Sequence, residues 1–175
     1  MLVALALLLS AAFGAGDQYL GSFSMHPWMA DVSLLSAPWL VLPFFAGCTQ
    51  REAKRAALLG LGCTFAALIG YGLMTLSPFE QAHLTTTSVA GFIRSSQRVF
   101  LGGLLTGPLF AWLGHRWRFG HAWWAAAATA AALCLEPLAR IEAGQAIRSS
   151  TVLLAEVAAG LTLMVLFAAR SFTTK

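Results

Sequence analysis

Four charged side chains lie inside or at the end of long apolar stretches of this chain, namely Asp17, Glu136, Arg140 and Glu156. Arg140 follows Glu136 by four residues, which is the spacing at which oppositely charged side chains pair on a helix, although Pro137 can interrupt the helix between them. Glu156 lies about 8 Å into its stretch at a helical rise of about 1.5 Å per residue.

A charged side chain at the centre of a membrane-spanning helix costs about 2.5–3.5 kcal/mol, so each of these groups needs a partner, a proton or access to water. One hypothesis is an outward-facing polar cavity lined by Glu136, Arg140 and Glu156, with Asp17 at its rim. The alternative is a structural ion pair together with a glutamate that snorkels or is protonated.

The remaining reactive side chains do not form a known catalytic or metal-binding pattern. We therefore predict that the chain is not an enzyme and that it has no catalytic residues, no cofactor and no metal. The two long connections carry His26 and His83, which either converge on a ligand or are separate surface histidines. The cysteines show no C-x-x-C spacing and are interpreted as small buried residues.

The elements that position these side chains are six long apolar stretches. Hydrophobic residues make up 58% of the sequence and charged residues 10%, whereas a soluble domain carries about 25% charged residues. A bilayer core about 30 Å thick requires about 20 apolar residues per helix. We therefore predict an all-α single domain, 1–175, that forms an integral membrane bundle of six transmembrane helices. The stretches run from Leu2 to Gly16, Leu34 to Cys48, Ala56 to Leu76, Val99 to Gly114, Ala122 to Leu138 and Thr151 to Ala169.

The basic residues are distributed unevenly between alternate connections. Seven lie in the connections after the second and fourth stretches and in the C-terminal tail, and four lie in the other connections. Because Lys and Arg are retained on the cytoplasmic side, both termini are predicted to be inside, in a bacterial plasma membrane. The first stretch lacks the positively charged start of a signal peptide, so it is interpreted as a helix.

Small residues recur at intervals of four along several stretches, and such stripes allow helix backbones to approach closely in lipid. Either they pack the six helices against each other, or some of them bind a separate membrane protein. The positions considered for packing against a partner helix are Ala6, Ser10, Gly14, Gly103 and Gly107. The second stretch contains Pro38 and Pro43, which predict a kink or, as the alternative, a broken helix that builds a binding site.

Three short segments together resemble a family of small polytopic bacterial membrane proteins, common in actinobacteria, for which no activity is assigned. They are Ser36-Ala37-Pro38-Trp39 with Phe44-Phe45-Ala46-Gly47, Gly70-Tyr71-Gly72, and Gly107-Pro108-Leu109-Phe110 with Gly114 and Glu136-Pro137. The resemblance implies a polytopic membrane protein and no catalytic residues. In architecture the chain is also similar to the substrate-binding subunits of energy-coupling-factor transporters, which implies that Ala6, Ser10 and Gly14 dock a coupling subunit.

These features favour a small-solute binding or transport component. The alternative function is a non-catalytic accessory subunit that packs against a larger membrane complex. The expected partners are the lipid bilayer, a small-molecule ligand and another membrane protein subunit, and nucleic acid is not expected.

Overall fold

The computed structural model describes residues 2–23, 26–80, 82–83, 85–142, 144 and 149–172. Within these ranges the chain is helical and contains no strand, which confirms the all-α prediction. Each of the six apolar stretches forms a helix. These are α1 (Leu2–Gly21), α3 (Ala37–Gly47), α4 (Ala53–Thr75), α6 (Gln97–Gly120), α7 (Trp123–Glu142) and α8 (Ser150–Phe172).

The two long connections contain further helices that the apolar pattern did not predict. They are α2 (Pro27–Ser33) and α5 (Thr86–Ser95), with a 3₁₀ turn, η1, at Pro78–Glu80. Pro27 occupies the first turn of α2, where a missing backbone N–H has no effect on helical hydrogen bonding. At α5 the hydroxyl of Thr85 caps the helix by accepting a hydrogen bond of 3.1 Å from the amide of Ser88.

Four of the described helices, α1, α4, α7 and α8, are long and apolar enough to cross a membrane. These helices indicate a multi-pass membrane protein, as the apolar stretches of the sequence predicted. Helix α3 has only 11 residues, so it is about 16 Å long at ~1.5 Å per residue and does not cross a bilayer alone. The prediction of six membrane spans is therefore confirmed only in part, and the orientation of the chain stays a prediction.

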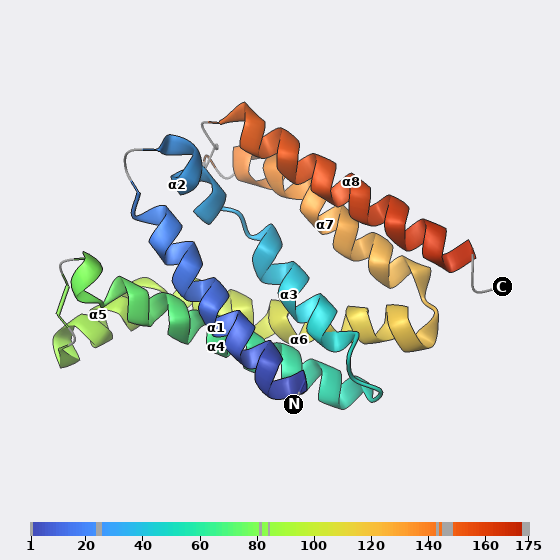
Figure 1. The fold of residues 1–175 in the computed structure, drawn as a ribbon, viewed down its shortest axis with the longest axis horizontal. Helices are drawn as coiled ribbons and strands as arrows, with labels where there is room; N and C mark the ends of the chain where they lie inside the picture. The colour runs from blue at the N-terminus through green and yellow to red at the C-terminus, as the bar shows by residue number, and fades with distance from the viewer. Residues whose placement is uncertain are drawn as a thin grey trace.

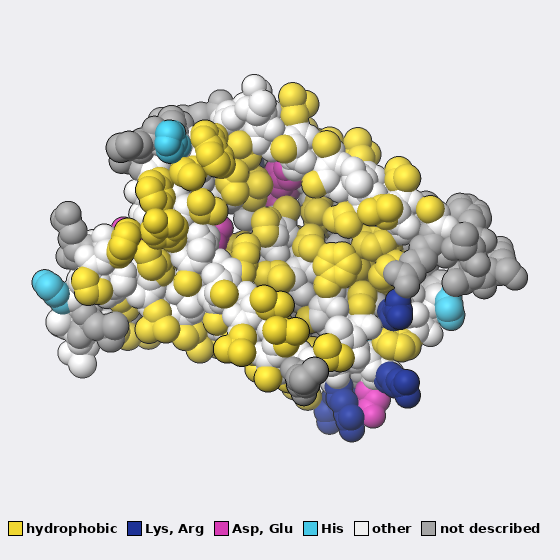
Figure 2. Space-filling view, viewed as in Figure 1, with side chains coloured by type: hydrophobic (Ala, Val, Ile, Leu, Met, Phe, Trp, Pro, Cys, Tyr) yellow, Lys and Arg dark blue, Asp and Glu magenta, His cyan; other side chains and the backbone are white. Residues whose placement is uncertain are grey.

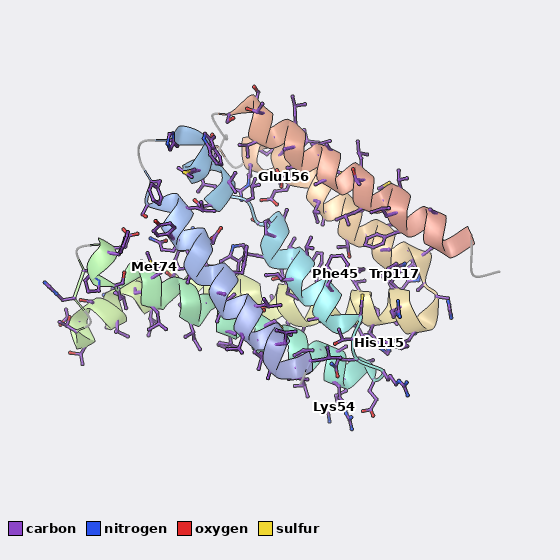
Figure 3. All side chains as sticks on the ribbon, viewed as in Figure 1. Phe45, Lys54, Met74, His115, Trp117 and Glu156 are labelled. Carbon is purple, nitrogen blue, oxygen red and sulfur yellow. The ribbon has the colours of Figure 1, made fainter. Side chains whose placement is uncertain are left out.

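The long helices run in alternating directions, and α3 lies between the pair α7–α8 and the group α1, α4 and α6 (Figure 1). The connections that carry α2 and α5 lie at one end of the molecule. Basic side chains gather at the opposite end, where Lys54 lies in the first turn of α4 (Figures 2 and 3). At that end His115 Nδ1 lies 2.9 Å from the carbonyl oxygen of Gln50, which joins the loop before α4 to the end of α6.

Glycine lets α1, α3, α4 and α6 touch through their backbones. A Cβ atom on Gly14 would overlap the carbonyl of Ala67, and one on Gly47 would overlap the carbonyl of Ala111. Gly70 meets α1 in the same way. The small-residue stripes of these helices are therefore used within the chain, as their internal-packing interpretation predicts.

The second apolar stretch is part of a broken helix. Helix α2 ends at Ser33, the backbone is not helical from Leu34 to Ser36, and α3 begins at Ala37, well inside the bundle (Figure 1). Pro38 lies in the first turn of α3, where proline is tolerated, while Pro43 lies inside the helix. Neither proline therefore interrupts α3, and the interruption lies before both of them, between α2 and α3.

Candidate binding site

The site forms around the break between α2 and α3. Helix ends leave backbone N–H and C=O groups without helical partners, and inside a membrane no water is present to pair with them. Here the groups in question are the carbonyl of Leu34, which caps the end of α2, and the amide of Ser36, which precedes α3. The break therefore needs polar side chains from another helix.

Helix α7 supplies these side chains as an ion pair. Arg140 Nη2 lies 2.6 Å and Nε lies 2.8 Å from Glu136 Oε1, and the two side chains are 11% and 8% exposed. The Arg140 Nη2 group also donates to the carbonyl of Leu34 and, over 3.0 Å, to the hydroxyl of Ser36. The amide of Ser36 donates to Glu136 Oε1 over 2.5 Å. One ion pair thus satisfies both sides of the break.

The pairing of Glu136 with Arg140 matches the four-residue spacing seen in the sequence. Helix α7 continues through Pro137, so the two side chains lie on the same face. The structure therefore confirms the ion pair, and Pro137 does not interrupt the helix between its two members. The pair also has a structural role, because it forms hydrogen bonds with the backbone at the break.

Glu156 on α8 is the third member of this charged group, and its carboxyl group lies beside that of Glu136. Its residue is 5% exposed, and neither of its carboxylate oxygens has a hydrogen-bond partner in the described part of the chain. It lies close enough to Glu136 and Arg140 to interact electrostatically with both. Oε2 of Glu136 is also buried without a partner. Among the described residues this group therefore has two carboxylates and one guanidinium.

A cavity of about 720 Å³ opens beside Glu156. This volume lies within the range of about 300–1,000 Å³ that is typical of small-molecule sites. Figure 2 shows an acidic side chain recessed among hydrophobic ones in the region where Figure 3 labels Glu156. The lining residues come from α2, α3, α7, α8 and the α2–α3 break, and most are apolar: Trp28, Val32, Leu35, Ala37, Pro38, Val41, Leu133, Thr151, Val152, Ala155, Glu156, Ala159 and Leu163.

The cavity differs from the predicted polar cavity. Of the four predicted residues only Glu156 lines it, because Glu136 and Arg140 are engaged at the helix break. Asp17 is 7% exposed and accepts a hydrogen bond of 3.3 Å from the indole Nε1 of Trp39, so it belongs to the contact between α1 and α3. The walls of the cavity are therefore apolar, with a single acidic group.

Two contributors to this site were missed in the sequence. Trp28 lies on α2, a helix that the apolar pattern did not reveal. Asp31 on the same helix is 5% exposed, and its Oδ2 accepts a hydrogen bond of 2.8 Å from the amide of Ser149, just before α8. The signal that could have revealed α2 is Pro27 followed by residues that favour the first turns of a helix.

The residues considered for packing against a partner helix lie largely inside the bundle. Ser10 is 2% exposed, and Ala6 packs against the core at Ala46, Leu59 and Cys63. Gly14 is buried against α4. Gly103 and Gly107 face Thr64 of α4, and Gly107 is buried. A partner could reach most of these positions only if α1 or α6 left α4, and docking through them stays a prediction.

Metal chemistry has no donor set in the described ranges, where no group of three His, Cys, Asp or Glu residues could hold an ion. The three cysteines are free thiols. No family model, curated protein or solved structure was found to match this chain. The two resemblances drawn from the sequence therefore stay predictions.

Proposed function

We propose that this chain is a membrane-embedded component that binds a small solute in the cavity between α2, α3, α7 and α8. In this proposal the long helices α1, α4, α6, α7 and α8 and the α2–α3 pair form one bundle in a bacterial plasma membrane, with both termini in the cytoplasm. The basic loops at one end of the bundle support that orientation, because cytoplasmic loops are enriched in Lys and Arg (Figure 2).

Glu156 is the observation that carries this proposal. A buried carboxyl group that lies beside a second carboxylate and receives no hydrogen bond from a cation or a backbone amide is unfavourable, and in a membrane such residues mark binding sites or ion pathways. Glu136 provides the contrast, because its paired oxygen has a clear structural role at the helix break. No described side chain offers Glu156 a similar role, and the side chain faces a cavity large enough for a ligand.

Native mass spectrometry of the gently extracted protein tests the proposal. We expect wild type to retain a small molecule and Glu156→Gln to lose it. Glu52→Gln serves as the matched control, because it removes the same charge from an exposed pair with Arg55 at the basic end of the molecule. It should retain the ligand.

One result would count against the role of Glu156, and another would count against solute binding itself. A ligand retained equally by wild type and Glu156→Gln would show that Glu156 is not part of its site. A wild-type chain that carries a stoichiometric protein partner and no small molecule would favour the accessory-subunit alternative.

A further inference from the structure

The charges around the cavity are unbalanced, and this imbalance bears on the class of ligand. The described group consists of the carboxylates of Glu136 and Glu156 and the guanidinium of Arg140. Arg140 directs its donors to Glu136, Leu34 and Ser36, and none of its hydrogen bonds goes to Glu156. Two adjacent carboxyl groups with one guanidinium disfavour the second ionisation, so both can be ionised only when a further positive charge joins the group.

The buried oxygens of this group that lack a donor are all hydrogen-bond acceptors. The unpaired atoms are Glu136 Oε2 and both carboxylate oxygens of Glu156, and all three accept hydrogen bonds when ionised. Of these atoms the two of Glu156 belong to the lining of the cavity, and a ligand that satisfies them must bring N–H or O–H donors. An anionic ligand would add to the negative charge and leave the acceptors unpaired, so this side of the cavity disfavours carboxylates and phosphates.

The rest of the wall selects for an apolar body. Trp28, Leu35, Pro38 and Leu163 belong to a lining whose polar side chains besides Glu156 are few. Apolar burial contributes about 25 cal/mol per Å² of surface removed from water, so a bulky apolar ligand gains more in this cavity than a small polar ion does. An inorganic cation would also lack the several oxygen ligands that hard cations require.

We propose that the cavity binds a hydrophobic organic cation, a protonated amine with an aromatic or branched apolar body, whose ammonium group donates to Glu156. This assignment rests on the proposed function and specifies its ligand class. The ammonium supplies the positive charge that lets Glu156 ionise beside Glu136, and its N–H groups meet the carboxylate oxygens of Glu156. Charge-assisted hydrogen bonds of this type are about twice as strong as neutral ones.

Three probes of the same shape but different charge test the proposal at pH 7. They are pyren-1-ylmethylammonium, the neutral pyren-1-ylmethanol and the anionic pyrene-1-carboxylate. Binding to the protein in nanodiscs of zwitterionic lipid is followed by energy transfer from tryptophan, since Trp28 lines the cavity. We expect wild type to bind the cation at least tenfold more tightly than the neutral probe, and the anion more weakly still.

Three variants test whether the preference for the cationic probe arises in the cavity. Glu156→Gln should reduce the affinity for the cation to that for the neutral probe, whereas Glu52→Gln should leave it unchanged. Ala159→Phe narrows the cavity and should weaken the binding of all three probes. The comparison of probes on wild type does not depend on the folding of any variant.

The outcomes separate the ligand class from the proposed function. If the three probes bind wild type equally and Ala159→Phe weakens all of them, solute binding in the cavity stands and the cation assignment is overturned. If the cation preference survives in both Glu156→Gln and Ala159→Phe, the cation binds elsewhere and the proposal is overturned. Absence of binding by every probe also overturns it, while a co-purified solute lost in Glu156→Gln would still support the proposed function.

Discussion

The helices pack against each other in different ways on the two sides of the bundle. Helices α1, α3, α4 and α6 approach until backbone meets backbone, at positions such as Gly14 and Gly70. On the other side, α2, α3, α7 and α8 leave a cavity of about 720 Å³ and bury a group of charges. Since lipid provides no hydrophobic drive for helix association, close contact must hold the bundle together. The glycine-packed side thus forms the scaffold, and the other side has room for a ligand.

A second contrast lies within the charged side itself. Glu136 Oε1 receives donors from Arg140 and from the amide of Ser36, whereas Glu156 receives none in the described residues. Two buried glutamates on neighbouring helices therefore differ in what their removal would do. Changes to Glu136 or to its partner Arg140 should lower the free energy of unfolding, whereas changes to Glu156 should weaken ligand binding.

The largest effect is expected from Arg140→Met. This change leaves Glu136 charged without its partner and removes the donors for Leu34 and Ser36 at the helix break. Breaking one side of a buried ion pair costs about 3–5 kcal/mol, so the free energy of unfolding should fall by that amount. Loss of helicity and tryptophan fluorescence during titration with SDS measures the change.

The double variant Glu136→Gln with Arg140→Met is the control for this interpretation. It removes the uncompensated charge, so it should be less destabilised than Arg140→Met alone. If both variants were as stable as wild type, the ion pair would have no part in holding the break.

The next effect concerns the glycine-packed side. Gly14→Ala places a methyl group against the backbone carbonyl of Ala67, which cannot move aside without separating α1 from α4. We expect a loss of about 3 kcal/mol, at the upper end of the range for overpacking. The same SDS titration measures it.

Two other glycines are matched controls for this comparison. Gly16→Ala on the same helix meets no atom within 4 Å and should change stability by less than about 1 kcal/mol. Gly160→Ala on α8 meets mainly the thiol of Cys134, at 2.6 Å, which can rotate away, so its loss should lie between the other two. Equal losses of unfolding free energy in Gly14→Ala and Gly160→Ala would contradict the conclusion that α1 and α4 are packed more tightly than α7 and α8.

The smallest effect on stability is expected from Glu156→Gln. Glutamine keeps the shape of this side chain and can donate a hydrogen bond to the neighbouring Glu136, so the free energy of unfolding should stay within about 1 kcal/mol of wild type or increase. A loss as large as that of Arg140→Met would show that Glu156 has a structural partner. The expected pattern is thus lost ligand binding with retained stability.

The sequence predicted the long helices and the ion pair because both depend on local patterns. Apolar runs specify the helices by composition, and the four-residue spacing brings Glu136 to Arg140 on one helix. Glu156 was also found from its position, because a charge within an apolar run stands out. Local pattern did not reveal α2 or α5, since both are short helices in connections that look like loops.

The location of the break and the existence of the cavity depend on contacts between distant parts of the chain. Pro38 and Pro43 indicate an irregular helix, but they do not place the break at Leu34–Ser36. The partners of that break on α7 lie at least 100 residues away in sequence, at separations of 106 for Arg140 and Leu34 and 100 for Glu136 and Ser36. The cavity requires the joint arrangement of four helices, and Asp17 was misplaced at its rim because its contact with Trp39 also depends on packing.

The dependence of the α2–α3 break on α7 has a consequence for the order of assembly during synthesis. Residues 27–47 leave the ribosome long before Glu136 and Arg140 are made, so the open carbonyl of Leu34 and amide of Ser36 must wait for their partners. Because unpaired backbone groups are unfavourable in lipid, this segment reaches its final depth only when α7 is inserted. A chain truncated before α7 should therefore leave residues 27–47 near the membrane surface, where water pairs with both groups.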